Sequence, residues 1–552
     1  MQVVLGVFEV LFGKGDSDHP LWLLAVRTNI LCFVVAVIVA VAAVVGLLYG
    51  HRLHLSRRDL AWCAGLTTVA ALLRFCVEHN LAELGGIGYS RILLGYNGNF
   101  ATAQLYSLLY AVSARDIEHA IFINRIAATL TIALVYVLCR RLNPASTAFA
   151  VCSAAFIALH PLHLLFSGTE ALAISTSLLA TASYLLLVLA LQGDDLPAPA
   201  RRWMAAGAAS GLILLTQVRY ENCLFLIPPV FYLQAHRHSP WLRRQWPAAV
   251  LFVGFFLAYA AATTASGVSY QHSDGTEASL RAAVGEAFGN PIFAIAPVVV
   301  GTLASIVSRR SRVRWPAPLP LVAAVATIAL ASKNGHHLAR TYANQVLLVS
   351  MIAGYGVALL WESPVWVGRL CAVATMAWAV ALPEVYWTNL RERHLETVEH
   401  DFFQRSLGSL PAGIDHVIVP DDEVLYRQSH SQIEAMRKYQ MIAAAVGLRG
   451  VELIGMTRFL EQREEVDCSR SNCLFFRGVP CMGISHYWFG AEGCAKVMEM
   501  AAGDAVRVED VVAGSVLDCS IYAGEVRRQI CDPVRKLQRF GMYRVHSSKA
   551  WR

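Results

Sequence analysis

The sequence predicts an α-helical protein that crosses a membrane about twelve times and carries a C-terminal soluble α/β domain. Two observations lead to this fold class. The 552 residues are 56% hydrophobic and only 15% charged, with a mean hydropathy of +0.48, and this apolar share exceeds that of ordinary soluble domains. Long apolar runs fill the first two-thirds of the chain, whereas the residues from about Tyr386 onward have the mixed composition of a soluble domain.

A transmembrane helix needs about 20 apolar residues, and the chain offers twelve candidate runs. They lie near residues 22–50, 60–77, 117–139, 147–165, 171–192, 203–217, 221–235, 246–266, 290–308, 317–332, 343–361 and 365–384. The runs at 203–217 and 221–235 are short, so a broken or re-entrant pair is an alternative there. The pattern predicts an N-terminal span and cytoplasmic loop over 1–59, a membrane core over 60–385 and a soluble domain over 386–552.

The positions of arginine predict how the spans are oriented. Short basic loops carry Arg52, Arg57, Arg58, Arg140, Arg141, Arg201, Arg202, Arg237, Arg243, Arg244 and the arginines around Arg309. We expect these loops to face the cytoplasm, so the opposite loops and the C-terminal domain face the outside. This pattern explains the net charge of +7, and nucleic acid is not expected as a partner. The expected location is a bacterial inner membrane with the soluble domain in the periplasm, because the Lys549–Arg552 tail carries no eukaryotic retention signal.

Alternating helical and strand patterns predict the α/β domain. Helices are expected in 390–411 and in 431–448, where Gly447 ends the second one, and strands in IDHVIVP, VELIGM and CLFFRG. The domain contains Cys468, Cys473, Cys481, Cys494, Cys519 and Cys531. An even number of cysteines in an outward-facing domain predicts disulfides, for example Cys519 with Cys531. A zinc site is the alternative, but the spacings contain no CxxC, and we expect no metal or cofactor.

Polar side chains cluster at the predicted outer ends of the spans. They are Glu78, His79 and Glu83, then His160, His163 and Glu170, then Arg219, Tyr220 and Glu221, and finally His336, His337, Arg340 and Tyr342. A carboxylate can remove a proton from a hydroxyl, while arginine and histidine can neutralise a phosphate leaving group. Together these groups suit the transfer of a group from a lipid phosphate to a water-borne acceptor.

Several of these groups also have a simpler interpretation. Glu78 and Glu83 can be solvated loop carboxylates, and Glu170 can be a charge at the start of a helix that the helix dipole favours. The arginine of the QVRYE turn can pair with the glutamate beside it. Arg74, inside the second span, either extends outward to solvent or tethers Glu78 one turn later.

Four stretches of the chain resemble the GT-C class of membrane glycosyltransferases. They are RFCVEHNLAELGGIGYSRILLGYNGN, HPLHLLFSGTEALAISTSLLATASYLLLVLAL, LLTQVRYENCLFLIPPVFYL and LARTYANQVLLVSMIAGYGVALL. In order, they resemble the first outer loop with its catalytic acidic residue, an acidic turn before a span, an arginine-containing break between spans, and a late outer turn that handles the lipid phosphate. The resemblance covers most of residues 60–385. It is to the branch related to protein mannosyltransferases and arabinofuranosyltransferases.

The resemblance implies inverting transfer of a sugar from a polyprenyl-phosphate donor to an envelope glycan, lipid or protein. The paired acidic residues of the family are here the separated Glu78 and Glu83, so the general base is either one. Residues expected to bind substrate or lipid phosphate are Arg219, His336, His337, Arg340, Tyr342 and Glu170. A transporter or flippase of lipid-linked glycans is an alternative, although its ionisable residues would lie nearer the membrane midplane. A ligase or polymerase of lipid-linked glycans is a further alternative.

Overall fold

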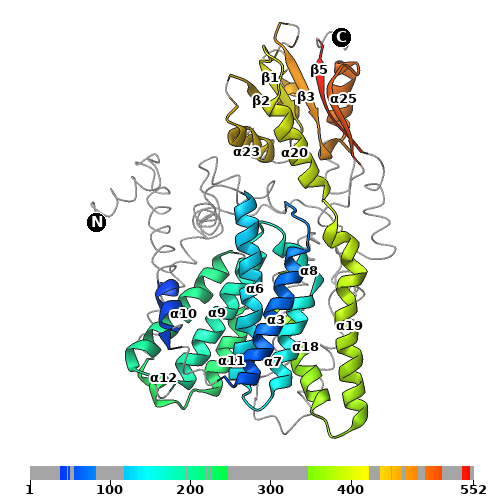
Figure 1. The fold of residues 1–552 in the computed structure, drawn as a ribbon. Helices are drawn as coiled ribbons and strands as arrows, with labels where there is room; N and C mark the ends of the chain where they lie inside the picture. Colours follow the sequence, from blue (N-terminus) through cyan, green and yellow to red (C-terminus); the bar gives the residue numbers. More distant parts are fainter. Residues whose placement is uncertain are drawn as a thin grey trace, which may run out of the picture. The chain divides into compact units, whose positions relative to one another are not determined.

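The computed structural model describes residues 38–46, 48–49, 55–81, 117–193, 196–218, 222, 225–245, 343, 346–421, 436–448, 450–462, 466, 468, 470–482, 491–511 and 538–546. These residues belong to two compact units (Figure 1). The first unit holds a bundle of helices. The second begins at Thr388 and also includes the described residues 78–81.

The bundle of the first unit is built from helices of very different lengths. They are α3 (Arg57–Phe75), α6 (Ile117–Leu142), α7 (Thr147–Leu159), α8 (Pro161–Ser167), α9 (Leu172–Gln192), α10 (Ala198–Val218), α11 (Ile227–Ala235), α12 (Pro240–Arg244), α18 (Val346–Trp361) and α19 (Trp366–Arg391). Helix α9 packs against α6 and α10, and α7 packs against α3, α6 and α18 (Figure 1). Within the described residues, α6 and α9 are long and apolar enough to cross a membrane. The predicted spans at 246–266, 290–308 and 317–332 lie outside the described residues.

The span expected over 147–165 is broken in the middle. Helix α7 ends at Leu159 and α8 begins at Pro161, with a bend of 57° between them. The described residues therefore contain a third candidate span only if α7 and α8 cross the membrane as one broken helix. Proline has no N–H to continue the helix. His160 before it has an extended backbone, with φ −64° and ψ 121°, which is the conformation that a following proline favours. Its Nδ1 accepts the N–H of Leu162 at 3.3 Å and so caps α8.

Contacts between helix ends show that α3 runs antiparallel to α6, and α9 antiparallel to α10. Asp59 in the first turn of α3 pairs with Arg140 near the end of α6 at 2.8 Å, and it also accepts the Tyr136 hydroxyl at 3.0 Å. Arg201 at the start of α10 donates to the Ala190 carbonyl near the end of α9 at 2.9 Å. The arginines at the start of α3 and α10 and at the end of α6 therefore share one end of the bundle, which is consistent with the expected cytoplasmic face.

The second unit is an α/β domain on a five-stranded sheet. Its elements are α20 (Leu395–Gly408), β1 (His416–Val419), α23 (Arg437–Val446), β2 (Glu452–Gly455), α24 (Met456–Glu461), β3 (Cys473–Arg477), η4 (Val479–Met482), α25 (Ala491–Ala501), β4 (Ala505–Val511) and β5 (Gln538–Val545). The strand order is β2-β1-β3-β5-β4. Strand β1 is parallel to β2 and β3, whereas β5 is antiparallel to β3 and β4. The three strands expected from the sequence are the three parallel ones.

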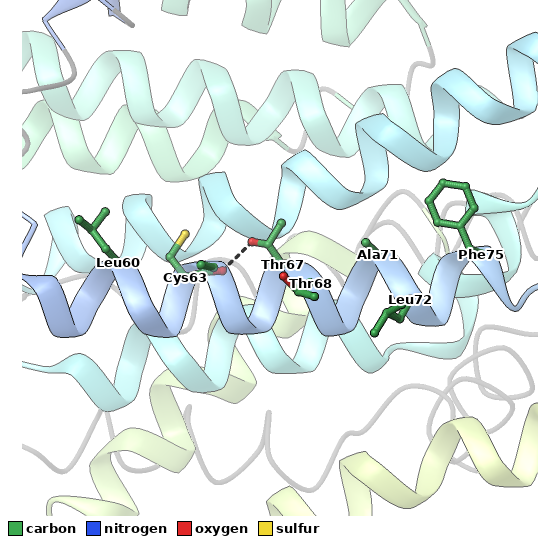
Figure 2. A pocket seen from close by; sticks show the side chains of 8 residues that line it. Leu60, Cys63, Thr67, Thr68, Ala71, Leu72 and Phe75 are labelled. Carbon is green, nitrogen blue, oxygen red and sulfur yellow. Dashed lines mark hydrogen bonds between the residues drawn. The ribbon is translucent and has the colours of Figure 1, made fainter.

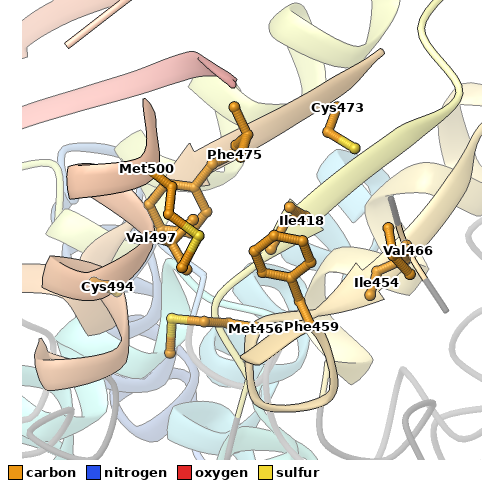
Figure 3. Close-up of a cluster of buried hydrophobic side chains, with 11 residues drawn as sticks. Ile418, Ile454, Met456, Phe459, Val466, Cys473, Phe475, Cys494, Val497 and Met500 are labelled. Atoms are coloured by element: carbon orange, nitrogen blue, oxygen red, sulfur yellow. The ribbon is translucent and has the colours of Figure 1, made fainter. Parts of the chain in front are cut away.

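Side chains of successive residues point to opposite faces of the sheet, and helices cover both faces. Phe475 of β3 packs with Phe459 of α24 and Val497 of α25 (Figure 3). On the other face, the ring of Phe476 lies 6.0 Å from that of Phe402 of α20. This alternation follows from the two-residue period of a strand. It buries β3 on both sides, which explains why CLFFRG is apolar throughout.

The two helices expected at the start of the domain are present with shorter bounds. Helix α20 begins only at Leu395, because α19 continues to Arg391 and the chain then leaves helical geometry. Helix α23 is followed by Gly447, whose φ is +69°. A glycine adopts this left-handed conformation without a steric penalty and so ends the helix. The predicted helix end at Gly447 is therefore confirmed.

Two disulfides close loops in the second unit, as expected for its cysteines. They join Cys468 to Cys473 and Cys481 to Cys494. The predicted pair of Cys519 and Cys531 lies outside the described residues. The longer loop connects η4 to α25, so its disulfide ties α25 to the 3-10 turn that follows β3.

Removing the Cys481–Cys494 disulfide is expected to destabilise the domain. The two cysteines are 13 residues apart, and closing a loop of this size stabilises a protein by roughly 2–4 kcal/mol, mainly through the unfolded chain. We expect the C481A/C494A variant to lose about that free energy of unfolding, measured by urea denaturation with protease accessibility of the domain as the signal. Cys371→Ala removes an exposed free thiol of α19 and is the control. Equal stability of both variants would contradict the expectation.

Candidate functional site

Buried polar residues meet at the end of the bundle opposite the arginine-rich one. Here α3 ends, α6 and α9 begin, and α8 lies beside them. Asn124 of α6 donates its amide Nδ2 to the carbonyls of Thr169 and Ala171, at 2.8 and 3.1 Å. These carbonyls flank Glu170, which is 0% exposed. Asn124 therefore fixes the backbone on both sides of this carboxylate.

The turn before Glu170 is fixed by its own side chains as well. The Thr169 hydroxyl donates to the Phe166 carbonyl at 2.9 Å and accepts the N–H of Ala171 at 3.2 Å. Ala171 is the N-cap of α9 and has no side chain that could cap the helix. Glu170 thus lies one residue before the N-cap, where the positive end of the helix dipole favours a carboxylate. This position suits both interpretations of Glu170 from the sequence, namely a charge that stabilises the start of a helix and a residue that binds substrate.

Arg74 is buried at 0% exposure and forms neither of the contacts expected from the sequence. Its guanidinium donates to the carbonyls of Ala70 and Ala158 at 2.9 and 3.4 Å, and its Nη2 lies 2.6 Å from Nδ1 of His163. The proline-induced break leaves the last carbonyls of α7 without helical partners, and Arg74 satisfies one of them. Extension to solvent and a tether to Glu78 are therefore both wrong.

The contact between Arg74 and His163 determines which ring nitrogen of the histidine carries a proton. A guanidinium can only donate, so Nδ1 of His163 accepts and the proton lies on Nε2. His163 Nε2 and Arg74 Nε are buried and have no hydrogen-bond partner within the part of the chain that the structure describes. Buried donors of this kind are costly unless an acceptor such as water or an anion satisfies them. The pair can therefore contribute donors to a bound oxyanion.

A second buried cation lies at the same end of the bundle. Arg125 of α6 is 5% exposed, and its Nη2 donates to the Val77 carbonyl at 2.6 Å. Its guanidinium also lies over the Phe75 ring, 5.6 Å from the centroid, in a cation–π contact. Arg125 thus holds the chain directly after α3.

Of the predicted general bases, Glu78 is described and Glu83 is not. Glu78 is half-buried, and its backbone N–H donates to the Leu390 carbonyl at 2.9 Å. Within the described residues its carboxylate forms no hydrogen bond or ion pair. Glu78 belongs to the second unit and Glu170 to the first. The remaining predicted site residues, Arg219, His336, His337, Arg340 and Tyr342, also lie outside the described residues.

Two polar residues of this cluster were missed by sequence reasoning. Asn124 and Arg125 belong to the INR that directly precedes the apolar run IAATLTIALVYVL, so the average hydropathy of the predicted span hides them. The available signal is that polar side chains within a span are rare and face the protein interior. Among the described residues, no group of three or more histidine, cysteine or acidic side chains could hold a metal ion.

Helix α3 also carries an apolar groove of about 640 Å³ on its outer side (Figure 2). Two rows with a spacing of four residues line it, namely Leu60, Ala64, Thr68 and Leu72, and Cys63, Thr67, Ala71 and Phe75. Small side chains in the middle of both rows leave the hollow between the larger residues at the ends. Thr67 donates its hydroxyl to the Cys63 carbonyl at 2.7 Å and so presents its methyl group. The groove extends to Phe75, over which Arg125 lies.

The part of the chain that contains Asn124, Arg125, His163 and Glu170 identifies the relationship. Residues 100–262 match the family model of the dolichyl-phosphate-mannose-protein mannosyltransferases. The resemblance expected from the sequence is confirmed for this segment. The mannosyltransferase-like segment spans α6 to α12 and contains the Asn124 clamp on Glu170, whereas Arg74 and Glu78 precede it. No curated protein matches the chain.

The solved structures that match this chain are distant from it in sequence. ArnT from Cupriavidus metallidurans has 11% identity and a TM-score of 0.47, covering 83% of this chain and 97% of its own. An oligosaccharyltransferase from Archaeoglobus fulgidus has 12% identity and a TM-score of 0.46, covering 79% and 72%. The arabinofuranosyltransferase AftD from Mycobacteria has 17% identity and a TM-score of 0.41, covering 66% and 31%.

Proposed function

We propose that this chain is a membrane glycosyltransferase that moves a sugar from a polyprenyl-phosphate donor to a glycan, lipid or protein acceptor of the cell envelope. The observation that carries this proposal is the mannosyltransferase-like segment over residues 100–262, which contains the Asn124 clamp on the buried Glu170. A membrane helix that only anchors a protein has no use for a buried amide, guanidinium and carboxylate at one end. An enzyme that transfers a charged lipid-linked group, by contrast, needs such polar side chains to bind its substrates.

The α3 groove and the cation at its end suit the two parts of such a donor. A polyprenyl chain is apolar and needs a surface that excludes water, which the groove offers from Leu60 to Phe75. The phosphate needs donors, and Arg125 lies beside Phe75. Arg74 and His163 add two donors that have no acceptor within the described residues. In this proposal the guanidinium groups stabilise the phosphate as it leaves.

The proposed chemistry is an inverting displacement at the anomeric carbon. Glu78 or Glu83 removes the proton from the acceptor hydroxyl, the oxygen attacks the sugar, and the bond from the sugar to the phosphate oxygen breaks. Arg219, His336, His337, Arg340, Tyr342 and Glu170 are the proposed further contacts to the phosphate or the substrate. Arginine and histidine suit the phosphate, and the carboxylate of Glu170 suits a sugar hydroxyl.

The two disulfides of the second unit support the proposed orientation. Disulfides persist in oxidising compartments such as the periplasm, and the unit has one between Cys468 and Cys473 and another between Cys481 and Cys494. Independently, the excess of arginine at the basic end of the bundle favours the cytoplasmic side for that end. We therefore place the proposed reaction at the outer face of a bacterial inner membrane.

The direct test is transfer of labelled sugar by the purified protein. A panel of polyprenyl-phosphate sugars is incubated with the protein and a membrane extract that supplies acceptors, and the released polyprenyl phosphate and the labelled product are both measured. Release of both together supports the proposal. Protein-dependent movement of a lipid-linked glycan across vesicle membranes, with no donor consumed, would instead establish the transporter alternative.

Filling the α3 groove is expected to weaken donor binding. Ala64→Phe and Ala71→Phe each place a ring in the hollow, so we expect the Kd for polyprenyl phosphate to rise about tenfold, which corresponds to a loss of about 1.4 kcal/mol. Ala61→Phe adds the same ring to an exposed position of α3 outside the groove and is the matched control. Titration of each of the three variants with polyprenyl phosphate in detergent measures the Kd. If Ala61→Phe weakens binding as much as the other two, the groove is not the binding surface.

A further inference from the structure

The described residues 78–81 are anchored to residues 390–397 by a set of short hydrogen bonds. Glu78 donates its N–H to the Leu390 carbonyl at 2.9 Å. The Asn80 amide donates to the Glu392 carbonyl at 3.0 Å, and the Leu81 N–H donates to the Thr397 hydroxyl at 3.0 Å. Glu78 and the residues after it are thus held by the end of α19, the start of α20 and the segment that joins them.

Asn80 is the centre of this network. It is 1% exposed, and its Oδ1 accepts both the His394 N–H at 2.7 Å and the Thr397 hydroxyl at 3.1 Å. The Thr397 hydroxyl therefore donates to Asn80 and accepts from Leu81, which uses its donor and one acceptor site. A buried network in which each member is satisfied is rigid, and it is costly to break because each lost partner leaves a buried polar group.

Asn80 also supplies what the start of α20 lacks. His394 is the N-cap of α20, and its side chain forms no capping hydrogen bond. In a capping box, an acidic side chain at the third helical position accepts the N–H of the N-cap residue. Here that position is Thr397, whose side chain bonds Asn80 instead, and Asn80 accepts the N-cap N–H. The first loop after α3 thus completes the capping of the first helix of the C-terminal domain.

Helix α20 connects this cap to the core of the domain. Its Phe402 and Phe403 are 0% exposed, and their rings lie 6.0 and 4.5 Å from the ring of Phe476 in β3. The helix is consequently fixed against the central strand. The carboxylate of Glu78 has no partner of its own within the described residues, so its position depends on the backbone that Asn80 and Thr397 hold.

We propose that Asn80 and Thr397 are positioning residues through which the C-terminal domain holds the catalytic loop, so that the domain is part of the catalytic apparatus. This inference rests on the proposed function and on Glu78 as its base. The rival interpretation is that the network only stabilises the domain. Positioning predicts a lower kcat in a folded protein with unchanged donor affinity, because a small displacement of a reacting group greatly lowers the rate, whereas a purely stabilising role leaves kcat unchanged.

The experiment compares Thr397→Val with Thr397→Ser in the full-length protein. Valine keeps the shape of threonine but removes the hydroxyl that bonds Asn80 and Leu81, and serine keeps the hydroxyl. We expect Thr397→Val to lower kcat about 10- to 100-fold with an unchanged Kd for polyprenyl phosphate, and to speed hydrogen exchange of the Leu81 amide. Thr397→Ser is expected to restore kcat to near that of the parent. Rates are measured well below the melting temperature of each variant.

The outcomes separate this inference from the function on which it rests. An active parent whose Thr397→Val variant keeps its kcat, while the Leu81 amide exchanges faster, overturns the positioning role and leaves the function standing. A parent that releases no polyprenyl phosphate from any donor overturns the proposed function and the inference together. Asn80→Ala is the second variant, and a loss of kcat in both Asn80→Ala and Thr397→Val with the domain still folded supports the inference.

Discussion

Glu78→Gln is expected to lower kcat about 10²- to 10⁴-fold, which is the usual contribution of a general base. Glutamine has the size of glutamate but cannot take a proton from the acceptor hydroxyl. Donor binding should be unchanged, because in the proposed mechanism Glu78 contacts the acceptor and not the phosphate. Initial rates of labelled-sugar transfer measure kcat, and a separate titration with polyprenyl phosphate measures Kd.

Two further variants make this result specific. Glu83→Gln decides between the two candidate bases, since only one of them should show the large loss. Glu492→Gln removes a carboxylate of α25 whose side chain is 85% exposed and paired with Lys496, and it should retain the parental rate. Full activity in both Glu78→Gln and Glu83→Gln would show that the base lies elsewhere in the chain.

Glu399→Ala is expected to cause the largest loss of stability in the C-terminal domain. Glu399 of α20 is 0% exposed and accepts the Tyr439 hydroxyl at 2.9 Å and the Val479 N–H at 2.7 Å. It also pairs with Lys438, so one side chain joins α20 to α23 and to η4. Removing one partner of a buried pair typically costs about 3–5 kcal/mol. Urea denaturation of the full-length protein, followed by protease accessibility of the domain, measures the loss.

Glu509→Ala provides the matched control for Glu399→Ala. Glu509 of β4 pairs with Arg405 of α20 at 2.9 Å, but both side chains are more than a third exposed. Exposed pairs contribute at most about 1 kcal/mol. We therefore expect a small loss, and an equally large loss in the two variants would mean that the buried position of Glu399 is not what matters.

The strands of the C-terminal domain show which parts of a fold can be predicted from sequence. Strands β1, β2 and β3 are buried on both faces, so their runs of apolar residues are visible in isolation. Strand β4 reads AVRVEDV, in which charges alternate with exposed Val506 and Val508. Strand β5 contains Gly541, a residue that strands usually avoid. Its pairing with β3 and β4 is a tertiary contact, and sequence patterns do not encode such pairings.

The polar cluster of the bundle was only partly predictable for a related reason. Glu170 lies in the turn between α8 and α9, and His163 in the short helix α8, where polar residues stand out from the neighbouring apolar runs; both were singled out from the sequence. Asn124 and Arg125 lie within an apolar helix, where their role depends on which carbonyls lie opposite. The predicted partner of Arg74 was wrong. Helix periodicity relates Arg74 to Glu78, whereas the break at Pro161 brings His163 to Arg74 instead. A broken helix changes contacts that a regular helix would fix.

The position of β5 in the sheet has a consequence for the synthesis of the protein. Among the described residues, β5 is the last strand in sequence order, yet it lies between β3 and β4 and is the only strand paired with β4. The N-terminal part of a chain leaves the ribosome first, so β4 emerges before its partner strand β5 has been synthesised. The parallel half of the domain can assemble early, but an unpaired β4 must wait for residues 538–545. Premature stop codons upstream of this strand should therefore produce chains with an open sheet edge, which quality-control proteases recognise.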